Sequence, residues 1–113
     1  MSLLEKSKEL LREKLNEIEV FDDGFESIDD VFREFDLTER EGEQFKATCV
    51  IISATYSYYC YEGEAAVIFY DAIKGQFFEV HGSHCSCYGL EGQWDPELIG
   101  DLDFYIEYMK RKN

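Results

Sequence analysis

Apolar residues recur with helical spacing in two segments of the N-terminal third. In residues 3–18, Leu4, Leu11, Leu15 and Ile18 recur at helical spacing, with lysine, arginine and glutamate between them. This pattern predicts an amphipathic helix. Gly24 interrupts it, and Ser27 then precedes a second apolar set, with Asp30 three residues later. Because serine is a favoured N-cap, we expect Ser27 to begin a short helix over residues 28–36.

β-branched and aromatic residues dominate the middle of the chain. Three such runs, residues 45–61, 65–70 and 76–81, are separated by Glu62-Gly63 and by the turn-like segment 71–75. Connections this short predict an antiparallel meander of three strands. Because side chains alternate along a strand, Phe77 and Phe78 are expected to face opposite sides of the sheet.

The C-terminal quarter combines an expected loop with an expected helix. Residues 82–93 carry three glycines and two serines, a composition typical of a loop. Asp95-Pro96-Glu97 then predicts a helix start, because aspartate caps, proline fits the first turn and an acid suits the positive helix end. Its expected buried stripe is Leu98, Leu102, Ile106 and Met109. The predicted fold is α+β, one domain over residues 1–113 with two N-terminal helices, a three-stranded antiparallel sheet and a C-terminal helix.

The charge of the chain narrows the classes of partner. Its 113 residues include 25 acidic and 11 basic side chains, which gives a net charge of −14. Such a chain repels nucleic acid and anionic membranes, so neither is an expected direct partner. It is attracted to basic surfaces, including those with which other proteins hold nucleic acid. The alternative is that the acidity serves only solubility.

The expected compartment decides how the cysteines are interpreted. Residues 1–20 lack the continuous apolar core of a secretion signal, and the apolar runs elsewhere are too short to span a bilayer. We therefore expect a cytoplasmic protein, in which cysteines stay reduced. Thiols or metal ligands are then expected in preference to disulfides at four positions, Cys49, Cys60, Cys85 and Cys87.

Both histidines of the chain lie close to two cysteines. His81, His84, Cys85 and Cys87 fall within seven residues, and imidazole with thiolate suits four-coordinate Zn²⁺. The spacing is not that of a zinc ribbon, and adjacent residues on an extended chain point in opposite directions. A complete site would therefore need a distant ligand. We expect one structural Zn²⁺; a reactive thiol and plain loop chemistry are the alternatives.

Cys60 is the expected distant ligand of this metal site. If the two short turns pair the three strands, Cys60 falls in one row with Ala66 and Val80, beside His81. Cys49, by contrast, is expected to be a small buried apolar residue. A catalytic Cys–His pair is disfavoured, and no glycine pattern for binding phosphate is present.

A dense acidic segment lies between Glu17 and Glu43. It holds twelve acidic side chains and only two basic ones, Arg33 and Arg40, so it carries −10 of the net charge of −14. Such a surface can imitate the phosphate spacing of a nucleic acid and occupy a basic groove. The expected partner-binding residues are Asp22, Asp23, Glu26, Asp29, Asp30 and Glu34. A solvated face is the alternative, and the spacing does not match a helix–loop–helix calcium site.

Tyrosines concentrate in the first expected strand, at Tyr56, Tyr58, Tyr59 and Tyr61. Tyrosine suits protein interfaces, whereas stacking on nucleic acid bases is disfavoured by the charge. We expect most of these side chains to contribute to the core, with an interface role as the alternative.

The segment 79–94, which contains His-Cys-Ser-Cys-Tyr-Gly-Leu-Glu-Gly-Gln-Trp, resembles a stretch of small bacteriophage and prophage proteins. Tyr61-Glu62-Gly63 before an alanine-containing strand is similar to the same family, and the resemblance covers roughly residues 58–97. With its acidity and length, the chain also looks like a zinc-containing anti-CRISPR protein that blocks the type II RNA-guided nuclease. That resemblance implies a small, acidic, non-enzymatic inhibitor in the host cytoplasm.

Two functional hypotheses of different classes follow. The leading one is a zinc-stabilised phage inhibitor that binds a basic surface of a host nuclease and keeps DNA out. The alternative is a small zinc or thiol enzyme of phage metabolism. A closed four-ligand metal site would favour the first, and a metal with an open coordination position would favour the second.

Overall fold

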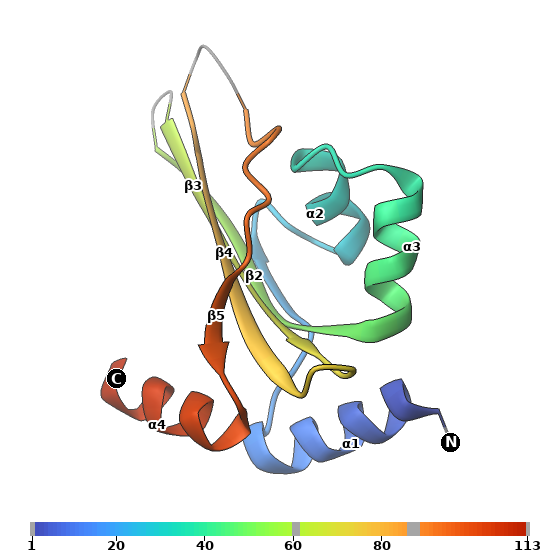
Figure 1. Cartoon of the computed structure of the whole chain (residues 1–113). Coiled ribbons are helices and arrows are strands. Elements are labelled where there is room, and N and C mark those ends of the chain that lie inside the picture. The colour runs from blue at the N-terminus through green and yellow to red at the C-terminus, as the bar shows by residue number, and fades with distance from the viewer. Residues whose placement is uncertain (1, 60–61, 86–88, 113) are drawn as a thin grey trace.

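The protein is an α+β fold of four helices and a five-stranded mixed sheet, seen in a computed structural model that describes residues 2–59, 62–85 and 89–112. Figure 1 shows the long central strands with the helices around them. The helices are α1 (Leu3–Leu15), α2 (Ile28–Glu34), α3 (Glu39–Thr48) and α4 (Leu102–Lys112). The strands are β1 (Val20–Asp23), β2 (Cys49–Tyr59), β3 (Glu62–Asp71), β4 (Gln76–His84) and β5 (Glu97–Gly100).

The strands lie in the order β1-β2-β3-β4-β5. Strands β2, β3 and β4 form the predicted antiparallel meander, and the predicted turn over residues 71–75 joins β3 to β4. β5 adds to one edge in antiparallel pairing, whereas β1 adds to the other edge in parallel pairing with β2. The sheet is therefore mixed and has two short strands more than we predicted.

Helices pack on both faces of the sheet. On one face, α2, α3 and the segment around Leu90 and Trp94 enclose the larger core cluster, which includes Phe35, Phe45 and Val80. On the other face, α1 and α4 cover a smaller cluster. Phe77 belongs to the smaller cluster, while Phe78 packs against the larger one. The predicted alternation of these two side chains is confirmed.

The helix α3 occupies residues that we predicted to be the start of the first strand. Thr38 caps it: the Thr38 hydroxyl accepts a hydrogen bond from the Glu41 amide, and the Glu41 carboxylate accepts one from the Thr38 amide. This reciprocal arrangement satisfies two amides that a helix start leaves unpaired. The strand prediction from residue 45 was wrong, because Phe45 is a core residue of this helix and the strand begins at Cys49.

The predicted helix start at Asp95-Pro96-Glu97 was also wrong. Residues 97–100 form the edge strand β5, and α4 begins only at Leu102. The Asp101 carboxylate accepts a hydrogen bond from the Phe104 amide, so Asp101 supplies the capping group expected of Asp95. Leu98 is consequently exposed, and Tyr105 is a buried residue of α4.

Other element boundaries shift by a few residues. α1 ends at Leu15 rather than residue 18, because Asn16 adopts a positive φ of 70° that ends the helix. α2 begins after Ser27 as predicted, but the Ser27 side chain makes no capping hydrogen bond. β4 extends to His84, so the first part of the expected loop over residues 82–93 is strand.

Candidate functional site

The two histidines lie on opposite faces of the sheet. They are three residues apart on β4, and side chains alternate along a strand. His81 is exposed on the face covered by α1 and α4, where its Nε2 lies 2.7 Å from the Glu79 carboxylate. His84 lies on the other face, with the larger core cluster. The strand therefore does not bring both histidines to one ion.

His84 is held in a defined position by two neighbouring strands. Its Nδ1 lies 2.8 Å from the Tyr56 hydroxyl on β2, and its ring makes an edge contact with the Tyr58 ring. Gly63, its partner on β3, leaves room for the imidazole, because a Cβ at this position would overlap His84 Cε1. Sequence spacing does not reveal this contact, because Tyr56 and His84 are 28 residues apart.

Tyr56 remains an uncharged phenol, and in this form its hydroxyl can hydrogen-bond to the His84 imidazole. Burial raises the pKa of Tyr56 well above its ordinary value, and the neighbouring Tyr58 raises it further. If the imidazole carries its hydrogen on Nδ1, it donates to the Tyr56 oxygen and keeps a lone pair on Nε2. Hydrogen bonds of this type orient histidines that bind metal ions.

The described residues fit only part of a metal site. His84 and the half-buried Cys85 follow one another at the end of β4, but no three His, Cys, Asp or Glu side chains in the described ranges form a metal-binding group. Two of the predicted ligands, Cys60 and Cys87, lie outside the described residues. The predicted row of Cys60, Ala66 and Val80 was wrong, because Ala66 pairs with Thr55 and His81, and Val80 pairs with Val67.

Cys49 lies in the core cluster on the α2–α3 face of the sheet, with 9% of its surface exposed. Burial raises the pKa of the Cys49 thiol, which favours the uncharged form. The prediction of a small buried residue is confirmed.

The predicted partner-binding acids differ in their local pairing. Asp29 forms an ion pair with Lys46 at 3.0 Å, and Asp30 forms one with Arg33 at 2.6 Å. The Asp30 carboxylate also accepts a hydrogen bond from the Glu26 amide, and together these contacts hold the pKa of Asp30 below its usual range. Asp30 thus caps α2, so part of the acidic segment is structural.

The other predicted partner-binding acids lie around α2. Asp22 is an exposed residue of β1, and Asp23 follows it on the same strand. Glu26 is exposed just before α2, and Glu34 is half-buried at the end of that helix. The negative charge of Glu34 contributes to the raised pKa of Tyr56, so this end of α2 lies near the Tyr56–His84 contact.

Charge is distributed unevenly between the two helical layers. The segment 26–46, which contains α2 and α3, has eight acidic side chains and three basic ones. The helices α1 and α4 together have five acidic and seven basic side chains. Because the two layers cover opposite faces of the sheet (Figure 1), the α2–α3 layer is acidic and the helices of the α1–α4 layer are slightly basic.

The tyrosines of β2 separate into core and surface residues. Tyr56 is 2% exposed and belongs to the larger core cluster, whereas Tyr58 is 59% exposed. Their rings lie 4.6 Å apart, and Tyr58 also contacts His84. The core interpretation is confirmed for Tyr56, and Tyr58 is an exposed aromatic residue at the end of the sheet near His84. Tyr61 lies outside the described residues, as does the side chain of Tyr59.

No protein-family model, curated protein or solved structure matches this chain. In the described part of the chain, no helix is both long enough and apolar enough to cross a membrane.

Proposed function

We propose that the protein is a non-enzymatic inhibitor that binds a basic, nucleic-acid-handling surface of another protein. The observation that supports this proposal best is the unequal charge of the two helical layers. Acids spread only for solubility would not need to gather on one side of the sheet, whereas a binder of a basic groove needs a continuous negative surface. Within the predicted set, Asp29 and Asp30 form ion pairs, whereas Glu26 and Glu34 form none with another described residue.

The likeness of this short, acidic chain to an anti-CRISPR protein makes the type II CRISPR RNA-guided nuclease the partner that we expect, in the host cytoplasm. Such a nuclease holds its guide–target duplex in a positively charged channel. An acidic protein bound there would exclude DNA without contacting nucleic acid itself. This mechanism requires no catalytic residue.

An order-of-addition experiment tests this function. Guide-loaded type II nuclease is mixed with the protein before or after labelled target DNA, and DNA binding is followed by fluorescence anisotropy. We expect the protein to prevent DNA binding when it is added first and to act poorly on the preformed complex, because both ligands need one basic surface. Equal inhibition in both orders would contradict competition, and no inhibition in either order would contradict the function.

We also propose that a structural Zn²⁺ fixes the end of the sheet where β4 terminates. The expected ligands are His84 through Nε2, with Cys85, Cys87 and Cys60. Cys85 can join His84 only where the chain bends after β4, because adjacent side chains of a strand point to opposite faces. His81 is the least suited member of the predicted set, because it lies on the opposite face beside Glu79. Zinc bound in this way would contribute directly to folding stability.

The zinc proposal predicts different outcomes for two histidine variants. Purified without chelators, the parent and His81→Ala are expected to hold about one Zn²⁺ per chain, as a closed tetrahedral site requires. His84→Ala and Cys85→Ser are expected to lose the metal and to melt at a lower temperature. Metal analysis and thermal unfolding measure both effects. A metal-free, fully folded parent would contradict the site, and loss of metal without a change in melting temperature would contradict its structural role.

A further inference from the structure

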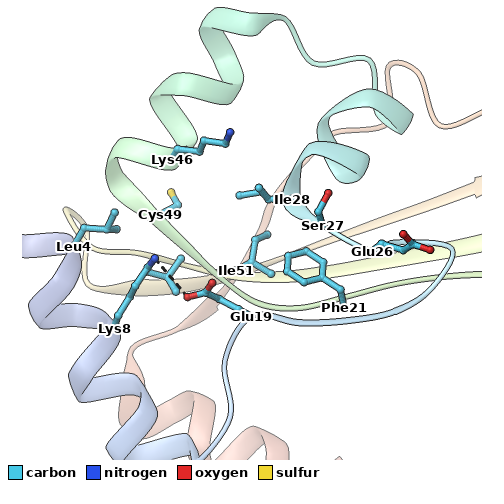
Figure 2. A pocket seen from close by; sticks show the side chains of 11 residues that line it. Leu4, Lys8, Glu19, Phe21, Glu26, Ser27, Ile28, Lys46, Cys49 and Ile51 are labelled. Atoms are coloured by element: carbon cyan, nitrogen blue, oxygen red, sulfur yellow. Dashed lines mark ion pairs between the residues drawn. The ribbon is translucent and has the colours of Figure 1, made fainter.

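A cavity of about 450 Å³ lies between α1, β1, α2, α3 and β2, away from the end of the sheet with His84. Figure 2 shows side chains from all five elements pointing toward it. A volume of this size falls within the range of small-molecule sites, about 300–1,000 Å³. The cavity lies apart from the proposed zinc site, and it shares Glu26 with the proposed partner surface.

The floor of the cavity is apolar. Ile51 and Cys49 come from β2, Phe21 from β1, Ile28 from α2 and Leu4 from α1. Ile51 is 2% exposed, so the floor is part of the core surface and has a fixed shape. An apolar group that entered would displace water from the partly exposed side chains of the floor, Leu4, Phe21 and Ile28, which favours binding.

The rim of the cavity carries two ammonium groups, one from α1 and one from α3. Lys8 lies 3.4 Å from the Glu19 carboxylate, and Lys46 lies 3.0 Å from the Asp29 carboxylate. All four side chains are partly or largely exposed, and ion pairs of this kind contribute little to stability. A ligand anion can therefore replace either carboxylate at small cost.

The remaining acid of the rim, Glu26, directs its carboxylate away from the apolar floor in Figure 2. The inner part of the cavity thus combines apolar side chains with two ammonium groups at its edge, each of which now lies beside a carboxylate. That combination is unusual on a chain with a net charge of −14.

From this arrangement we infer that the cavity binds a small amphipathic anion, an apolar body with one terminal acidic group such as a medium-chain carboxylate. The apolar body would lie on Phe21, Ile28 and Ile51. The acidic group would pair with Lys8 or Lys46 at the rim.

Decanoate is the probe for this site. Titration of the labelled protein, followed by two-dimensional NMR, is expected to give saturable changes at amides of the cavity floor. Decanol, which has the same chain without the charge, is expected to bind more weakly. No saturable change, or changes centred on the exposed Leu98 and Phe104 of β5 and α4, would overturn the inference.

A pair of double variants isolates the role of charge. Lys8→Met with Lys46→Met keeps the apolar stems and removes both ammonium groups, and it is expected to weaken decanoate binding about tenfold or more. Lys6→Met with Lys14→Met removes the same charge from exposed positions of α1 outside the cavity lining, and it should bind like the parent. Equal affinity of the two double variants for decanoate would overturn the inference.

Discussion

Replacing Phe77 by alanine is expected to lower the free energy of unfolding by about 3–5 kcal/mol, the range for a large buried aromatic residue. Phe77 is 0% exposed, and its ring stacks on Tyr105 with 4.1 Å between centroids and 3° between planes. It also contacts Tyr70 on β3, so it connects the sheet with α4. Because domains are stable by only about 5–15 kcal/mol in total, this variant should show a strongly lowered melting temperature.

Phe104→Ala is the matched control for this prediction. It removes the same side chain from the same region, but Phe104 is 54% exposed on α4. Its cost is expected to stay within about 0.5 kcal/mol. Urea unfolding followed by circular dichroism measures both variants. If Phe77→Ala and Phe104→Ala lowered the free energy of unfolding by similar amounts, the result would contradict the burial of Phe77 between the sheet and α4.

The alternation that buries Phe77 could be predicted from the sequence. The β-branched and aromatic runs, interrupted by short turns, are a local pattern, and they correctly indicated β2, β3 and β4 as a meander. The turn over residues 71–75 is likewise local, since the Asp71 carboxylate accepts hydrogen bonds from the Ile73 and Lys74 amides. Such contacts span only a few residues and leave a clear trace in the sequence.

The elements that were missed depend on competing or distant interactions. Thr38 and Glu41 carry a recognisable helix-start pattern, but the aromatic Phe45 was assigned to the strand that follows it. β1 and β5 are four residues each, and each exists because it hydrogen-bonds to a distant strand. Asp95 and Asp101 are both plausible caps, and only the pairing of residues 97–100 with β4 decides between them.

The candidate site also depends on contacts between residues that are distant in the sequence. Closeness in sequence grouped His81 with His84, but the pleat of β4 places them on opposite faces of the sheet. The position of His84 depends on Tyr56 and Gly63, which reach it through strand pairing. The acidity of the segment 17–43 was evident from composition, whereas the structural role of Asp30 became clear only from its hydrogen bond to the Glu26 amide.

Acids with a structural role, such as Asp30, are unsuitable for testing the proposed partner surface. Reversing Asp29 or Asp30 would remove an ion pair, and for Asp30 also a helix cap, so weaker binding would be ambiguous. Glu26, Glu34 and Glu43 lie in or beside α2 and α3, and the structure gives no ion pair for them. They are the positions at which charge can be changed with little effect on folding.

The triple variant Glu26→Lys, Glu34→Lys and Glu43→Lys is expected to bind the guide-loaded nuclease roughly 100-fold more weakly than the parent. About 1 kcal/mol for each exposed charge contact accounts for this factor. Most of the loss at low salt should appear as slower association, because complementary charge accelerates encounter. Raising the salt concentration should reduce the difference in affinity between the variant and the parent. Salt screens charges that are more than a Debye length apart, and this length is about 8 Å at physiological ionic strength. Binding kinetics at two salt concentrations measure all three effects.

The control variant carries the same change in net charge at other places. Glu9→Lys and Glu13→Lys on α1 with Glu97→Lys on β5 also replace three acids, all of them exposed, on elements outside the α2–α3 layer. If net charge alone drives binding, the two triple variants should be weakened equally. If the acidic layer is the contact surface, the control should retain most of the parent's affinity, because its changed residues lie farther from the partner. Parent-like inhibition by the α2–α3 variant at low salt would instead identify that layer as a solvated face, and the exposed Tyr58 would become the next position to test.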